Sequence, residues 1–276
     1  MKIALCQILS TADPQENLAI VSTYAREAAA NGAELIVFPE ATQRAFGTGR
    51  MDETAEPLGG PFDQAVTQLA EELQVTIVVG TFRPADVKDG YQRFYNTVLV
   101  RGPEARPADA AGSDTGIHYD KIHLYDAFGY QESQTVAPGE QLVTFHQGGI
   151  TCGLATCYDI RFPEQFKALA QAGAEAIIVP TSWAHGPEKL RMWRTLASAR
   201  ALDATCYILA AGQALPPDAD ERKGPTGTGH SVAVHPNGAI IAEAGEAPEI
   251  IYADIDPAVV ATTRKELPVL TGTREL

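Results

Sequence analysis

The stretch GITCGLATCYDIRFPE, from Gly149 to Glu164, predicts a buried strand that runs into a helix. Its first half is an apolar run, and Pro163 is typical of the first turn of a helix that ends at Gly173. Cys157 lies between the two, where backbone N–H groups lack partners and the helix dipole favours a thiolate. The position suits a nucleophile, although an isolated cysteine is more often a core thiol.

Length and composition are compatible with one large domain or two small ones, of which we favour one. The chain has 276 residues, of which 45% are hydrophobic, enough to bury a substantial core. We therefore expect a single domain over residues 1–276. The formal net charge of −14 argues against nucleic acid or an anionic membrane as a partner, because both bind clustered Lys and Arg.

Targeting, membrane and metal signals are weak in this sequence. The N-terminal apolar run is soon interrupted by polar residues, unlike a signal peptide, and no run approaches the ~18 apolar residues of a membrane span. The histidines lack the spacing of metal ligands, and the cysteines lack CxxC spacing. We expect a cytoplasmic protein without metal or other cofactor, in which Cys6, Cys152 and Cys206 are core thiols.

Apolar periodicity predicts strands that alternate with helices. Helices are expected at 14–31, 62–74, 163–173 and 187–204, with a last one starting at Asp256-Pro257. Strands are expected at 2–9, 34–38, 75–81, 94–100, 141–145, 149–156, 176–180, 205–211, 229–235, 239–244 and 250–255. The alternation indicates an α/β fold, and the hairpin-like C-terminal strands indicate antiparallel pairing, so a mixed sheet is expected.

Two further charged residues stand beside apolar strands. Glu40 follows the strand 34–38 in LIVFPE, and the Gly-containing segment 43–60 after it is long enough for a lid or binding loop. Lys121 lies within IHYDKIHLYD, at 117–126. A lone lysine in such a run usually points to solvent, so its interpretation depends on partners elsewhere.

The segments around Glu40, Lys121 and Cys157 together resemble the nitrilase or carbon–nitrogen hydrolase superfamily, whose Glu, Lys and Cys occupy these contexts in this order. The resemblance spans nearly the whole chain, including FYNTVLV, PTSW and GHS, and is closest to the branch of omega-amidases and deaminated-glutathione amidases. It implies a four-layer αββα sandwich of two mixed sheets, usually dimerised through a helical face. We therefore expect a homodimer or a dimer-based oligomer.

The resemblance also implies a catalytic triad and its supporting groups. Glu40 would act as acid and base, and Cys157 would form a thioester with an amide carbonyl. Lys121 and the backbone N–H of Tyr158 would stabilise the oxyanion. Glu132, between Lys and Cys, would orient Lys121 or contact the substrate. The implied activity is amide hydrolysis with release of ammonia.

Substrate recognition is implied for three residues after the nucleophile. Arg161 would pair with a substrate carboxylate, or would instead tie Asp159 or Glu164 into the helix start. Trp183 and His185 lie in a loop that the resemblance places at the substrate, although this loop departs from the Thr-containing form of omega-amidases. The expected partner is a small carboxylate-bearing amide. The alternatives are a nitrilase that converts a nitrile to an acid, and a catalytically silent binding protein with the same fold.

Overall fold

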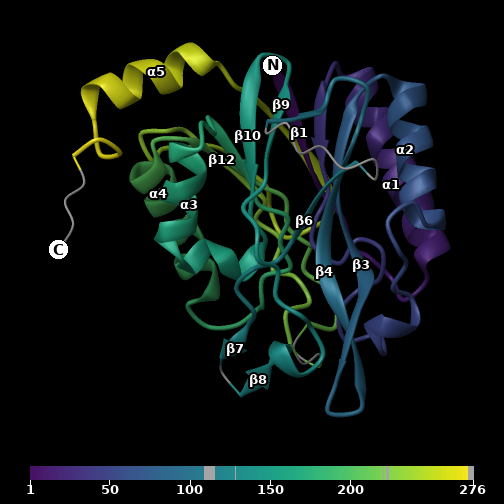
Figure 1. The fold of residues 1–276 in the computed structure, drawn as a ribbon. Coiled ribbons are helices and arrows are strands. Elements are labelled where there is room, and N and C mark those ends of the chain that lie inside the picture. The colour runs from purple at the N-terminus through teal and green to yellow at the C-terminus, as the bar shows by residue number, and fades with distance from the viewer. Residues whose placement is uncertain (109–115, 128, 220, 222–223, 273–276) are drawn as a thin grey trace.

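The computed structural model describes the chain except for residues 109–115, 128, 220, 222–223 and 273–276. Two β-sheets lie face to face, and helices cover the outer face of each (Figure 1). A small third sheet pairs β7 (Asp126–Ala127) with β8 (Tyr130–Gln131). The predicted α/β class and the four-layer sandwich of two mixed sheets are confirmed.

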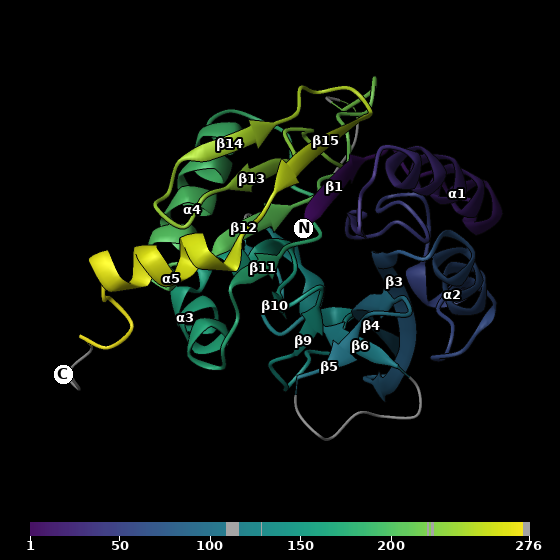
Figure 2. The ribbon, with the colours of Figure 1, turned by 90° about the horizontal axis from the view of Figure 1, so that it is seen from above.

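The first sheet has six strands in the order β15-β1-β2-β3-β4-β6. Its strands are β1 (Lys2–Gln7), β2 (Leu35–Val37), β3 (Thr76–Lys88), β4 (Tyr91–Arg101), β6 (Ile117–Asp120) and β15 (Glu249–Asp254). The pairs β1·β2 and β2·β3 are parallel, and the other pairs are antiparallel. Helices α1 (Pro14–Ala30) and α2 (Pro61–Leu73) cover its outer face (Figure 2). Both helices begin with Pro, whose fixed φ suits a first turn.

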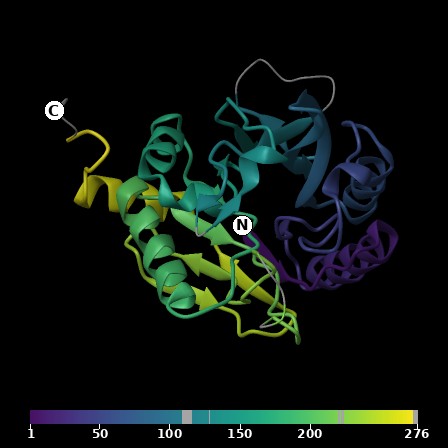
Figure 3. The same cartoon turned by 90° about the horizontal axis from the view of Figure 1, so that it is seen from below.

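The second sheet has seven strands in the order β14-β13-β12-β11-β10-β9-β5. Its strands are β5 (Arg106–Pro107), β9 (Thr144–Gln147), β10 (Ile150–Leu154), β11 (Ala176–Ile178), β12 (Tyr207–Ala210), β13 (Val232–Val234) and β14 (Ile240–Glu243). The pairs β10·β11 and β11·β12 are parallel. Helices α3 (Pro163–Gln171) and α4 (Lys189–Ala204) cover this sheet on the side away from α1 and α2 (Figure 3).

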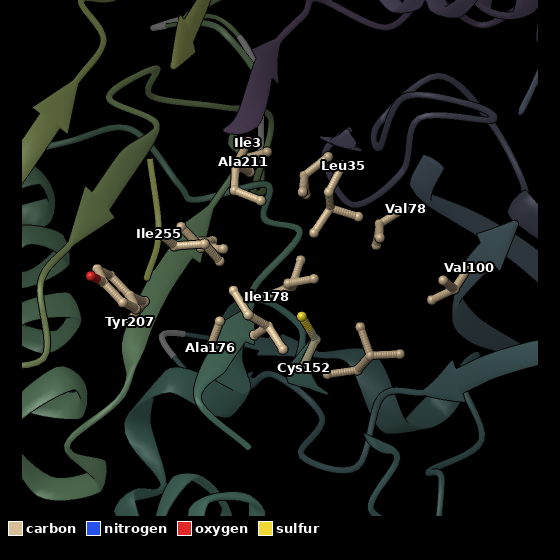
Figure 4. Packing of buried hydrophobic residues seen from close by; sticks show 14 of the residues in the cluster. Ile3, Leu35, Val78, Val100, Cys152, Ala176, Ile178, Tyr207, Ala211 and Ile255 are labelled. Atoms are coloured by element: carbon tan, nitrogen blue, oxygen red, sulfur yellow. The ribbon is translucent and has the colours of Figure 1, made fainter. Parts of the chain in front are cut away.

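The space between the two sheets is filled by aliphatic side chains. Ile3, Leu35 and Val78 point from the first sheet toward Cys152 and Ile178 of the second (Figure 4). All five side chains are fully buried. Burying a Leu or Ile contributes ~1.5–3 kcal/mol each, so this layer holds the sheets at a fixed spacing and register. The ends of strands that are distant in sequence are thereby fixed near one another.

The last strand pairs in a way that the sequence pattern did not indicate. β13 and β14 form the predicted antiparallel hairpin around the turn at 236–238. After β14 the chain leaves the second sheet, and β15 pairs with β1 of the first, from Lys2↔Asp254 to Gln7↔Glu249. This strand therefore covers an edge of the first sheet and connects the C-terminal part of the chain to its beginning.

Some predicted boundaries were wrong. β3 and β4 extend well beyond 75–81 and 94–100 and form one long hairpin, because their polar, exposed outer halves carry no apolar pattern. β9 begins at Thr144 rather than at 141. Within the segment 102–116, which joins the two sheets, residues 109–115 lie outside the described residues, and Arg106–Pro107 form β5. α5 (Pro257–Glu266) extends away from the sandwich, and the Arg264 guanidinium anchors it by donating to the Ala174 carbonyl at 2.6 Å (Figure 1).

Candidate active site

The three residues of the predicted triad come together at strand ends of the facing sheets. Glu40 follows β2, Lys121 follows β6 directly, and Cys157 follows β10. The Lys121 ammonium lies 3.2 Å from Glu40 Oε1, and the Glu40 carboxyl also interacts with the Cys157 thiol. All three side chains line one pocket and are almost completely buried. The convergence required for nucleophilic chemistry is therefore present.

The nucleophile candidate occupies a strained turn. Cys157 has a φ of +45°, in the left-handed region that a non-glycine residue seldom adopts. It begins a 3₁₀ turn, η3 (Cys157–Arg161), that stands between β10 and α3, where the sequence predicted a direct passage from strand to helix. Thr156 and Asp159 form a capping box at this turn. Because Tyr158 lies in the first turn of η3, its backbone N–H has no partner within that turn.

The carboxyl of Glu40 is held at both oxygens. The Asn96 amide donates to Oε1 at 2.7 Å, and the Ser182 backbone N–H donates to Oε2 at 2.8 Å. Gly80 of β3 lies against the backbone here, and a Cβ on it would stand 2.7 Å from the Glu40 Cα. Only glycine permits this approach, so the position of Glu40 depends on an adjacent strand as well as on its own segment.

Lys121 is buried between two carboxylates. Its ammonium lies 3.2 Å from Glu40 and 3.0 and 3.1 Å from the two oxygens of Glu132. Glu132 begins a 3₁₀ turn, η2 (Glu132–Gln134), and also accepts from the Tyr125 N–H at 2.5 Å. The structure thus places Glu132 beside Lys121, one of the two positions that the sequence left open.

Burial and these charges shift the ionisation of the cluster. Burial alone would lower the pKa of Lys121, but Glu132 and Glu40 hold that pKa well above its ordinary value. Burial raises the pKa of Glu40, against the effect of Lys121, whose single charge is shared with Glu132. Burial and the Glu40 charge raise the pKa of the Cys157 thiol well above its usual range. These shifts keep the thiol protonated at rest, and the raised pKa of the adjacent Glu40 carboxyl makes that group a better acceptor for the thiol proton.

The cluster lines a pocket of about 470 Å³ including its open mouth. Tyr158, Arg161 and Trp183 line it together with the triad. Phe46, from the segment 43–60 predicted as a lid or binding loop, also lines the pocket. His185 is exposed and is not among the residues that line the pocket.

Arg161 has aromatic neighbours and no carboxylate partner within the described part of the chain. Its guanidinium lies 5.2 Å from the Trp183 ring centroid and 5.8 Å from that of Tyr158. In the part of the chain that the structure describes, neither Asp159 nor Glu164 pairs with it, so the alternative of a tie within the helix start is not realised. Arg161 Nε is buried and has no hydrogen-bond partner among the described residues.

Comparison with known proteins identifies the family. The family model described as carbon–nitrogen hydrolase matches residues 2–265. The chain belongs to the carbon–nitrogen hydrolases. The resemblance drawn from the three sequence segments is therefore confirmed, and amide hydrolysis is the general activity that this membership supports.

Relatives of this carbon–nitrogen hydrolase include amidases. A protein named as a hydrolase from Mycobacterium tuberculosis is 45% identical over 98% of this chain and 94% of its own length. The deaminated glutathione amidase of Escherichia coli O157:H7 is 34% identical over 99% and 97%. Human omega-amidase is 30% identical over 99% and 95%. Among solved structures, Saccharomyces cerevisiae Nit3 of the nitrilase superfamily superposes with a TM-score of 0.77 at 28% identity, over 98% and 94%.

Behind Cys157 in this hydrolase, Asp159 joins the segment that carries Lys121 to the turn η3. Its fully buried carboxylate accepts from the Thr156 N–H at 2.8 Å, from the Tyr119 hydroxyl at 2.6 Å and from the His123 N–H at 2.9 Å. Tyr119 belongs to β6, which leads to Lys121, and Thr156 precedes Cys157. One carboxylate therefore fixes two catalytic candidates relative to each other.

Sequence reasoning missed several residues of the site. Asn96 holds Glu40, and its polar side chain within the apolar run FYNTVLV was a usable signal. Ser182 contributes backbone groups, which leave no signal in residue type: its N–H donates to Glu40, and its carbonyl accepts from the Cys157 thiol at 3.6 Å. Lys189 lines the pocket from the first turn of α4, where a lysine is otherwise typical of a solvated helix face.

Metal and membrane sites are absent from the described part of the chain. No group of three or more His, Cys, Asp or Glu side chains there could hold a metal ion. None of the helices that the structure describes combines the length and apolar composition needed to cross a bilayer.

Proposed function

We propose that this protein is an amidase that hydrolyses a linear amide of a small carboxylate-bearing metabolite through a thioester on Cys157, with release of ammonia. The observation that carries the proposal is the convergence of Glu40, Lys121 and Cys157 at the floor of one pocket. The amidases among the relatives support the reaction class. Arg161 lines the pocket and has no carboxylate partner among the described residues, which supports a carboxylate on the substrate.

In the first half of the reaction, the Cys157 thiol gives its proton to Glu40 and the sulfur attacks the amide carbonyl. A C–S bond forms, and the carbonyl electron pair moves to oxygen as an oxyanion. The Lys121 ammonium and the Tyr158 N–H stabilise that charge, each contribution being worth about 3–4 kcal/mol where such donors have been removed. Glu132 keeps Lys121 charged and directed into the site.

In the second half, the oxyanion collapses and the C–N bond breaks. Glu40 gives its proton to the departing nitrogen, so ammonia leaves and a thioester remains. Glu40, again a carboxylate, then removes a proton from water, whose oxygen attacks the thioester carbonyl. The acid product is released and Cys157 recovers its proton. One carboxyl group therefore serves alternately as base and acid, for which its raised pKa is suited.

A panel of amides and nitriles tests the proposal by ammonia release. We expect turnover of amides such as alpha-ketoglutaramate and deaminated glutathione, and an acyl adduct on Cys157 by mass spectrometry after acid quenching. Conversion of nitriles with amides untouched would establish the nitrilase alternative. Absence of turnover and of iodoacetamide modification at Cys157 would favour a silent binding protein, because an unactivated buried thiol does not react.

The whole chain, residues 1–276, acts in this proposal as a single hydrolase domain. Its site needs both sheets: Glu40 and Lys121 follow strands of the first, and Cys157 follows a strand of the second. A cytoplasmic location fits the chemistry, since thiols stay reduced there and all four cysteines are free. No cofactor or metal is needed for any step.

We also propose that two copies associate through the helical side of the second sheet. Large apolar side chains are exposed on or beside α4, β14 and the end of α5: Leu202, Ile240, Ile241 and Leu267. Contact between two such faces would cover them. Light scattering after size exclusion should give about twice the monomer mass at micromolar concentration, and Ile241→Glu should shift it toward the monomer. A monomeric wild type would rule the association out.

A further inference from the structure

Asn96 on β4 connects the two charged groups of the proposed triad. Its side-chain amide donates to Glu40 Oε1 at 2.7 Å, and its backbone carbonyl accepts from the Lys121 N–H at 2.9 Å. All three side chains are buried. β4 lies between β3 and β6 in the first sheet, so a residue of an inner strand holds both the segment after β2 and the residue after β6.

The two oxygens of the Glu40 carboxyl have unequal surroundings. Oε1 accepts from the Asn96 amide at 2.7 Å and from the Lys121 ammonium at 3.2 Å. Among the described residues, the backbone donor to Oε2 is the Ser182 N–H, at 2.8 Å. A carboxylate oxygen offers two lone-pair sites, so the two side-chain donors fill Oε1, whereas Oε2 keeps a site for a proton.

The Cys157 thiol lies on the Oε2 side of this carboxyl group. Ser182 contacts both groups through its backbone: its N–H donates to Glu40 Oε2, and its carbonyl accepts from the thiol at 3.6 Å. A hydrogen bond also joins the thiol and the Glu40 carboxyl. The oxygen with an open lone-pair site is therefore the one held beside the sulfur.

The contact with Glu40 leaves the other end of the Asn96 amide unpaired. Asn96 Oδ1 is buried and has no hydrogen-bond partner in the described part of the chain. The opposite orientation of the amide would place this oxygen against the Glu40 carboxylate, which would repel it. An unpaired buried carbonyl is unfavourable for folding, so Asn96 is better explained by its effect on Glu40 than by a contribution to stability.

We propose that Asn96 is a positioning residue that, with Lys121, fills Oε1 of Glu40, so that Oε2 takes the Cys157 proton and later delivers it. The inference rests on the amidase function above and specifies its proton path. In the first half, the S–H bond breaks, an O–H bond forms at Oε2, and the sulfur electron pair forms the C–S bond. In the second half, the proton moves from Oε2 to the nitrogen, which keeps the electron pair of the broken C–N bond and leaves as ammonia.

The same contact affects the ionisation of Glu40. Burial raises the pKa of Glu40, Glu132 adds to this rise, and Lys121 and the Asn96 amide oppose it. Because the amide stabilises the charged carboxylate, its loss should raise the pKa of Glu40 further. Glu40 must be ionised in the free enzyme to accept the thiol proton. The acid limb of the pH profile of kcat/KM should therefore move to higher pH when the amide is removed.

Asn96→Leu tests this role, because leucine has nearly the shape of asparagine and keeps the backbone carbonyl that binds Lys121. We expect kcat/KM for amides at pH 7 to fall about 10- to 100-fold, mainly through kcat, as for loss of one hydrogen bond to a charged group. The acid limb should move to higher pH. The thermal unfolding midpoint should stay within about 3 °C of the wild type, since loss of the contact with Glu40 and loss of the unpaired carbonyl offset each other.

Thr97→Val is the matched control on the same strand. Thr97 is fully buried, and its hydroxyl donates to the Asp120 carboxylate at 2.6 Å, so the variant also removes one hydrogen bond to a carboxylate. Its turnover should stay within about threefold of the wild type, with the acid limb unchanged.

Other outcomes for Asn96→Leu would overturn the assignment. If Oε1 carried the proton, removal of a competing donor would free that oxygen, and turnover would be unchanged or faster. A loss of activity without movement of the acid limb would indicate a purely structural role for Asn96.

Titration of Glu40 in Cys157→Ala, with and without Asn96→Leu, separates this inference from the amidase proposal. Carbon-13 NMR of labelled glutamate side chains would follow the titration, with the Glu40 signal assigned from its loss in Glu40→Gln. We expect a higher midpoint in the presence of Asn96→Leu. If the wild type hydrolyses no amide but this shift appears, the amidase function fails and the coupling of Asn96 to Glu40 stands. If amides are hydrolysed but Asn96→Leu changes neither the midpoint nor kcat/KM, only the inference fails.

Discussion

Cys157→Ala is expected to reduce ammonia release from amides by about 10⁴-fold or more, because the thiol that forms the acyl intermediate in the proposed reaction is removed. The fold should survive. Alanine has the same Cβ at the left-handed φ of +45°, and only a sulfur atom at a pocket wall is lost. Ammonia assays and thermal unfolding by circular dichroism would measure both effects.

Cys206→Ala is the matched control for this variant. Cys206 is also a buried thiol, but it lies against the Ala174 carbonyl at 3.0 Å, away from the pocket lining, and burial raises its pKa to about 11. Its loss should leave turnover within about twofold. If Cys157→Ala kept more than about a hundredth of wild-type turnover, or if the control lost as much, the nucleophile assignment would be wrong.

Lys121→Met should damage both activity and stability. Loss of an oxyanion donor should lower kcat about 10²- to 10³-fold. Glu40 and Glu132 would then remain as buried carboxylates without a cation, which should cost about 3–5 kcal/mol of unfolding free energy near neutral pH. Kinetics and denaturant unfolding would measure the two losses separately.

The pH dependence of that stability loss has a defined sign. Without Lys121, burial would raise the pKa of Glu40 further above its unfolded value, because the nearby cation that opposes the effect of burial is lost. The neutral form of Glu40 is then favoured in the folded state, so stability is retained below the unfolded pKa of about 4.3 and lost as pH rises. The difference in unfolding free energy between the wild type and Lys121→Met should therefore increase from about pH 5 to pH 8.

The double variant Lys121→Met/Glu132→Gln distinguishes the two roles of Lys121. Removing one of the unpaired charges should recover part of the lost stability, and activity should stay low because the oxyanion donor is still missing. Recovery of activity together with stability would mean that Lys121 only neutralises Glu132, and would contradict its part in catalysis.

Much of the fold was predictable because its signals are local. The helix start at Asp256-Pro257, the Pro163 in the first turn of α3 and the apolar strands each depend on a few neighbouring residues, and the structure confirms them. Predicted strand boundaries were wrong where the apolar pattern is absent, as in the polar outer half of the β3–β4 hairpin. The pairing of β15 with β1 was not predicted for a different reason. About 250 residues separate the two strands in sequence, and no local pattern encodes which strand β15 pairs with.

The sequence by itself determined the family and the α/β class, and it singled out Glu40, Lys121 and Cys157 as candidates, because residue type and order along the chain carry that information. The tertiary structure alone decided which groups surround them. The sharing of Lys121 between two carboxylates, the Ser182 backbone at Glu40 and the place of Lys189 beside Arg161 all arise when two sheets pack and bring distant strand ends together. Packing of side chains over long sequence separations sets these contacts, and a linear pattern records the residues without recording their distances.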